Sequence, residues 1–99
     1  MTQQLYKAVT RRRLDDRTVQ LIDQVAARSY FELDDLIKRT VTEFRASIVR
    51  MVHEYLKEQG RASDLLNLYL TLNRDTWTVR IALTFSNRDT ALMLKLALN

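Results

Sequence analysis

The chain has 99 residues, of which 46% are hydrophobic and 28% are charged, and its formal net charge is +4. This composition is typical of a folded domain and excludes a disordered polyelectrolyte. Cysteine and proline are absent and glycine occurs once, which excludes disulfides, thiolate metal sites and glycine-rich phosphate loops. No apolar run reaches the ~18 residues that span a bilayer, and the first residues lack the apolar region of a secretory signal. We therefore expect a single domain over residues 1–99, in the cytoplasm and without membrane association.

The first segment leaves two structures open. Residues 4–12 fit a short edge strand, but Leu5, Val9 and Arg12 also share one face of a helix. Asp15 or Asp16 then provides an N-cap for a helix that runs to about residue 28.

The segment from Ser29 to Gly60 predicts one long amphipathic helix. Ser29 and Glu32 match the S-x-x-E capping box, and Gly60 suits a left-handed C-terminal cap. Tyr30 and Phe31 are expected to fill the corner before this helix. Apolar residues recur at spacings of 4, 3, 4, 3 and 4 and form one stripe, which comprises Ile37, Val41, Phe44, Ile48, Met51 and Tyr55. The spacing suits a helix seam, so the stripe is a candidate dimer or partner interface, unless the rest of the chain covers it.

After Gly60 the apolar period changes from 3.6 to 2. Alternation over residues 66–72 and 77–85 predicts two strands, and the Asn-Arg-Asp-Thr segment at 73–76 predicts the turn between them. The same tetrapeptide recurs at 87–90, and residues 90–98 fit either a third strand or a short helix. The expected fold is α+β. N-terminal helices, including the long central helix, pack against a C-terminal antiparallel hairpin that the third strand or short helix closes.

The sequence offers little for catalysis. The single histidine, His53, lies on the polar face of the long helix beside Glu54, where a solvated surface residue is the simplest interpretation. Asp34 and Asp35 are adjacent on a helix and do not converge on a metal ion, so they are expected to complement the helix dipole. We expect no enzymatic activity, no metal and no cofactor.

Basic residues gather near the N-terminus and form the densest charge cluster of the chain. They are Lys7, Arg11, Arg12, Arg13 and Arg17. Such an arm supplies phosphate contacts whose affinity does not depend on base sequence, although Asp15 and Asp16 partly balance it and a solvated arm is the alternative. On the outward face of the hairpin, Tyr69 and Arg80 fit stacking on a base, with cross-strand packing as the simpler explanation.

Residues 14–44 resemble the two helices of ribbon-helix-helix DNA-binding proteins. Leu14 opens the segment and acidic capping residues follow it. The first helix ends in Val25-Ala26, and Leu36-Ile37 lies ten and eleven positions after Ala26.

This resemblance implies a homodimer whose paired N-terminal strands enter the major groove. Residues of the 6–13 segment would then read bases, and the region from Ser29 to Glu32 would contact phosphate.

The leading hypothesis is a small, non-enzymatic, dimeric nucleic-acid-binding protein that uses its basic arm for phosphate contacts. The alternative is a protein–protein interaction module, such as an adaptor or inhibitor, that docks through the long helix or a sheet edge.

Overall fold

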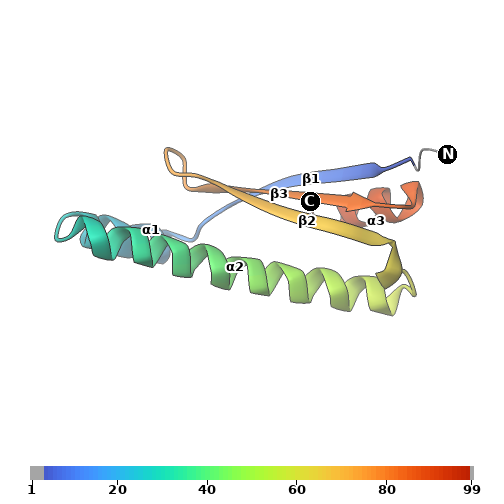
Figure 1. Cartoon of the computed structure of the whole chain (residues 1–99), viewed down its shortest axis with the longest axis horizontal. Coiled ribbons are helices and arrows are strands. Elements are labelled where there is room, and N and C mark those ends of the chain that lie inside the picture. The colour runs from blue at the N-terminus through green and yellow to red at the C-terminus, as the bar shows by residue number, and fades with distance from the viewer. Residues whose placement is uncertain (1–3, 99) are drawn as a thin grey trace.

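A computed structural model describes residues 4–98 of the chain. The molecule is elongated, with extents of 52 × 29 × 18 Å. In chain order, the helices and strands are β1 (Tyr6–Arg13), α1 (Asp16–Ala26), α2 (Tyr30–Glu58), a short 3-10 turn (Ala62–Asp64), β2 (Leu65–Asn73), β3 (Thr78–Phe85) and α3 (Arg88–Leu98) (Figure 1). None of the described helices is both long enough and apolar enough to cross a membrane.

The three strands form one antiparallel sheet in the order β1-β3-β2. β1 pairs with β3 from Tyr6 opposite Phe85 to Arg13 opposite Thr78. β2 pairs with the other edge of β3, with a register shift between Leu65 and Asn67. β3 is therefore the central strand, and β1 and β2 are the edges.

The predicted architecture of N-terminal helices followed by a C-terminal hairpin is wrong, although the class is α+β. The first element is a strand, and the hairpin lies in the middle of the chain. Of the two alternatives for residues 90–98, the structure has the helix, α3. The sequence of residues 4–12 leaves strand and helix open because the inward positions of β1 include Ala8, Thr10 and Arg12, which give no apolar alternation. β3 needs a hydrogen-bonding neighbour on both edges, and the N-terminal segment provides the second one.

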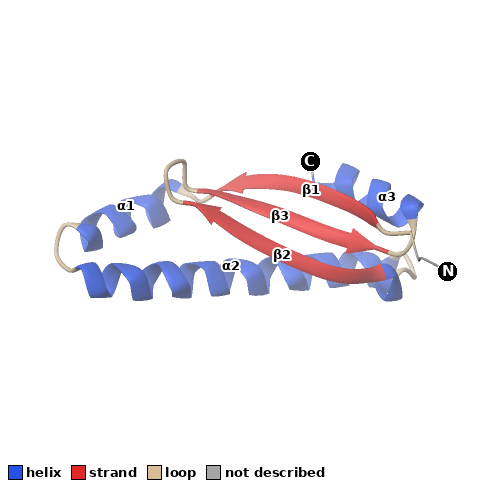
Figure 2. Ribbon diagram, turned by 45° about the horizontal axis from the view of Figure 1, so that its top comes forward, coloured by secondary structure: helices blue, strands red, loops and turns tan. Residues whose placement is uncertain are grey.

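The helices pack on one face of the sheet, which we call the inner face. α1 lies alongside α2, and α3 packs against β1 and β3. In Figure 2 the strands lie in front of α2, and none of the described helices covers the face turned to the viewer. The core centres on the inward side chains of β3, which are Val79, Ile81, Leu83 and Phe85.

Helix α2 begins as the sequence predicts, with one difference. Ser29 is the N-cap, and its Oγ accepts a hydrogen bond from the Glu32 backbone N–H at 3.4 Å. The reciprocal half of the capping box does not form, because the Ser29 N–H donates to the Val25 carbonyl at 3.0 Å. Tyr30 and Phe31 do not fill the corner: they are 80% and 89% exposed.

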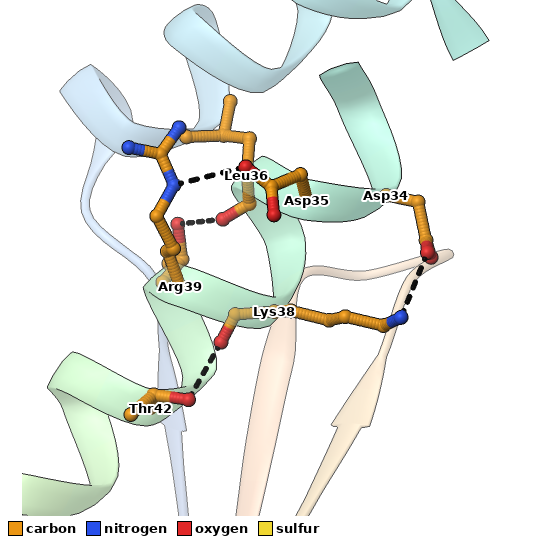
Figure 3. Close-up of polar contacts among 7 residues, drawn as sticks. Asp34, Asp35, Leu36, Lys38, Arg39 and Thr42 are labelled. Atoms are coloured by element: carbon orange, nitrogen blue, oxygen red, sulfur yellow. Dashed lines mark hydrogen bonds and ion pairs between the residues drawn. The ribbon is translucent and has the colours of Figure 1, made fainter. Parts of the chain in front are cut away.

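In the first turns of α2, two exposed ion pairs join an aspartate to a basic residue four positions later. Lys38 Nζ lies 3.1 Å from Asp34, and Arg39 Nε lies 3.4 Å from Asp35 (Figure 3). Such exposed i,i+4 pairs contribute about 0.3–0.5 kcal/mol each. Arg74 in the β2–β3 turn also lies 3.7 Å from Asp34, so this turn is linked to the helix beneath the sheet.

The Asn-Arg-Asp-Thr segments share one local geometry but lead to different elements. Asn73 Oδ1 accepts from the N–H groups of Asp75 and Thr76, and Trp77 follows with a positive φ of 53° before β3 begins. Asn87 Oδ1 accepts from the equivalent N–H groups two and three residues on, and α3 follows directly. Asn87 therefore caps α3.

Helix α2 ends in a Schellman motif that depends on Gly60. The Gly60 N–H donates to the Lys57 carbonyl at 3.1 Å, and the Arg61 N–H donates to the Leu56 carbonyl at 2.8 Å. Gly60 has a φ of +68°, and a Cβ added there would meet no atom within 4 Å. The requirement for glycine is therefore one of backbone conformation, not of space.

Replacing Gly60 with alanine is expected to lower the free energy of unfolding by about 1–2 kcal/mol, the cost of a left-handed residue that carries a Cβ. Urea denaturation measures the change. The neighbouring Gln59→Ala variant, at a right-handed exposed position, serves as the control and should unfold at nearly the wild-type midpoint. Equal urea midpoints for Gly60→Ala and wild type would contradict the conclusion that the left-handed conformation at this position requires glycine.

The start of α1 gives a prediction for acid stability. The Thr18 N–H donates to the Asp15 carboxylate at 2.7 Å, and this bond lowers the pKa of Asp15 below its usual value. A lowered folded-state pKa means that the stabilisation is present above the unfolded pKa of about 3.9 and is lost as the pH falls through the folded value. The Asp15→Ser variant, which keeps a neutral cap, should therefore unfold more easily than wild type at pH 7. The difference should shrink in urea titrations below about pH 4; a difference independent of pH would oppose this account.

Candidate nucleic-acid interface

The outer face of the sheet carries basic side chains from two strands. Strand side chains alternate between faces, so the register of β1 with β3 places Lys7, Arg11 and Arg13 on the outer face beside Arg80. All four are exposed. We call this surface the basic sheet face.

Arg11 and Arg80 are direct cross-strand partners. With Thr71, Asn73, Thr76 and Thr78 they line a shallow hollow of about 440 Å³. Two guanidinium groups, side-chain hydroxyls and an amide thus surround one open space. Guanidinium groups bind phosphate oxygens through paired N–H donors, so the hollow has the chemistry of a phosphate site.

Few carboxylates oppose this charge. The sequences of the three strands contain no aspartate or glutamate. Within residues 4–98, the ion pairs do not involve Lys7, Arg11 or Arg80, while Arg13 has an exposed contact of 3.8 Å with Asp16. Like charges placed directly opposite each other destabilise a sheet. The Arg11–Arg80 pair is therefore a local cost to the fold that a bound anion would relieve.

An apolar row crosses the centre of the same face. Val9, Ala82 and Tyr69 are aligned across the three strands, and the Tyr69 side chain is 63% exposed. The Arg11–Arg80 row flanks it on one side, and the row of Lys7 and Thr84 flanks it on the other. The arrangement places one aromatic ring between two cationic rows.

The structure separates the five predicted basic residues. Lys7, Arg11 and Arg13 share the basic sheet face. Arg12 alternates with Arg11 and Arg13 along β1, so its side chain is on the inner side of the sheet. Its guanidinium donates to the Leu98 carbonyl at 3.2 Å and links β1 to the end of α3. Arg17 lies on α1, exposed and off the sheet.

Arg80 is not among the five basic residues predicted to contact phosphate, although the sequence pattern places it on the outward face of the hairpin. The missing information was the pairing of β1 with β3, which brings Arg80 opposite Arg11. Without that pairing, Arg80 and Tyr69 were two isolated residues rather than part of a surface.

The apolar stripe of α2 divides into buried and accessible parts. Ile37 and Ile48 are buried within the chain, and Val41, Phe44 and Tyr55 are half-buried. Met51 is exposed. The sheet and the neighbouring helices thus cover much of the stripe, and its role in association with another chain stays a prediction.

β1 is also the segment that the ribbon-helix-helix resemblance assigns to a strand pair between two chains. Here it pairs over its whole length with β3 of its own chain. Pairing two β1 strands through their free edges would bring the arginine runs of both chains together. For this reason we consider the sheet face, rather than a two-chain ribbon, as the candidate interface.

Other candidate sites carry no organised chemistry. His53 and Glu54 are exposed on α2. No cluster of three or more potential metal-ligating side chains occurs within residues 4–98. Comparisons of the chain with protein-family models, curated proteins and solved structures found no match.

The opposed arginines predict a measurable repulsion. In a double-mutant cycle of Arg11→Thr and Arg80→Thr, the coupling energy should be unfavourable by about 0.2–1 kcal/mol at low salt. It should fall toward zero at about 1 M salt, where the Debye length is about 3 Å. Urea unfolding of the four proteins at two salt concentrations measures it. A favourable or salt-independent coupling would show that the two side chains do not repel each other.

Proposed function

We propose that this chain binds single-stranded nucleic acid through the basic sheet face. The observation that carries the proposal is the direct pairing of Arg11 with Arg80 on an open face whose strands contain no acidic residue. A polyanion satisfies both guanidinium groups at once.

The spacing of the cations favours a polymer over a small anion. Along β1, Arg11 is about 7 Å from Arg13 and about 13 Å from Lys7 at the usual rise of a strand. A line of charge about 20 Å long exceeds the size of one phosphate and suits a chain of phosphates.

The aromatic row favours a single strand over a duplex. Proteins that bind single strands without strong sequence preference combine a cationic groove with aromatic rings on which bases stack. Tyr69 offers such a ring beside Arg80, on a sheet whose outer face is not covered by any of the described helices. In a duplex the bases are already stacked and their faces are not accessible.

Fluorescence anisotropy with labelled oligonucleotides tests the proposal. Four phosphate contacts predict a log–log salt slope of about −3 on single strands, and the Arg11→Ala/Arg80→Ala variant should reduce it to about −1.5. Tyr69→Ala should weaken binding by about 5- to 150-fold, which corresponds to a stacked base worth about 1–3 kcal/mol.

Two control variants distinguish binding by the basic sheet face from a general effect of net charge. Arg12→Ala removes a charge next to Arg11 but on the inner side, so it should reduce thermal stability and leave the affinity of the folded protein nearly unchanged. Arg50→Ala/Lys57→Ala removes two charges from exposed positions on α2 and should retain binding. Absence of salt-dependent binding at about 50 mM salt would overturn the proposal, and equal binding of duplex would overturn the preference for single strands.

A further inference from the structure

A second basic cluster lies where β1 begins and α3 passes beneath it. A hollow of about 290 Å³ is lined by Lys7 from β1 and by Arg88 and Lys95 from α3, together with apolar side chains that include Leu5 and Leu92. No carboxylate lines it. We call it the α3 hollow.

The sequence of α3 turns one mixed face toward this hollow. Arg88, Leu92 and Lys95 are spaced i, i+4 and i+7, which places them on one side of a helix. Asp89 lies about 100° further round the helix and is not among the lining residues. The cations therefore converge without a neutralising partner in the lining.

Two features of the hollow are unfavourable for the isolated protein. Arg88 lies in the first turn of α3, where the helix dipole disfavours positive charge. Leu5 and Leu92 are 53% and 50% exposed beside these cations. A ligand with a negative group would neutralise the cations, and a flat apolar surface on the same ligand would cover the exposed leucines. A nucleotide unit has both features.

Lys7 connects the α3 hollow to the basic sheet face. Its side chain belongs to the outer row with Thr84, and it also lines the hollow. The two cationic surfaces are therefore continuous at the start of β1 and form one path from Arg80, past Tyr69, to Lys95.

We infer that a single strand of nucleic acid leaves the sheet over the start of β1 and ends in the α3 hollow. Arg88 and Lys95 contact phosphates there, and a base packs on Leu5 and Leu92. This inference rests on the proposed function and adds to it a second subsite and a direction of the path. Short oligonucleotides occupy the sheet alone, and longer ones occupy both surfaces.

A length series tests the second subsite. Labelled oligothymidylates from about 4 to 16 nucleotides, the range of known single-strand site sizes, are titrated against wild type and Arg88→Gln/Lys95→Gln. For wild type, affinity should rise with length until the strand reaches the hollow. The variant should match wild type on the shortest strands, reach its plateau at a shorter length, and lose about 1.4 units of salt slope on the longest.

The charge-matched control is Arg50→Gln/Lys57→Gln, which removes two charges from exposed positions on α2 that do not line the hollow. Circular dichroism and thermal melts confirm that each variant is folded. If Arg88→Gln/Lys95→Gln binds every length as wild type does while Arg11→Ala/Arg80→Ala fails, the inference is wrong and the proposed function stands. An equal loss in the α2 control assigns the effect to net charge and also overturns the inference. If wild type binds no length, the proposed function fails first.

Discussion

The structure depends on the complete burial of the inner side of β3. Val79, Ile81, Leu83 and Phe85 are each at most 1% exposed, and they belong to one hydrophobic core with side chains from all three described helices. A buried central strand requires hydrogen-bonding neighbours on both edges, so β1 and β2 are fixed as its partners. That requirement brings residues 6–13 next to residues 78–85 and sets which of their side chains face outward.

The elements with local signals were predictable. Helix α2 has a capping serine, acid-first charge pairs and a terminal glycine, and all of these act within a few residues of the chain. The β2–β3 turn has an asparagine that organises the following two N–H groups. The partners in these interactions lie within a few residues of each other in the chain, so the sequence pattern alone identifies them.

The two identical tetrapeptides show where local signals end. Asn73 and Asn87 make the same two side-chain to backbone bonds. The first is followed by Trp77 and β-forming residues and enters a strand, whereas the second is followed by Ala91 and leucines and enters a helix. The burial of Thr90 adds a tertiary reason, because its hydroxyl donates to Asp64 at 2.6 Å and accepts from Arg61 at 2.9 Å. These bonds fix the start of α3 against the turn after α2, a contact that no local pattern contains.

The candidate site was predictable only as a concentration of charge. The run Arg11-Arg12-Arg13 has no preferred face until the segment is known to be a strand. Once it is paired with β3, the period of two divides the run: Arg12 holds α3 through the Leu98 carbonyl, and its two neighbours face solvent. The inner arginine contributes to stability, and the outer arginines remain available to a ligand.

Because Arg12 faces inward and its neighbours face outward, the electrostatic repulsion on the basic sheet face is confined to a small part of the sheet. Repulsion between Arg11 and Arg80 acts on one row of the sheet, whereas burial of apolar side chains along the whole inner side of β3 stabilises the fold. A bound phosphate chain would remove the repulsion, so part of the free energy of the proposed binding would come from relief of this repulsion in the free protein. Salt screens that repulsion as well as the attraction to phosphate. A ligand that binds only the folded sheet also stabilises it by mass action, so occupancy and fold stability should rise together at low ionic strength.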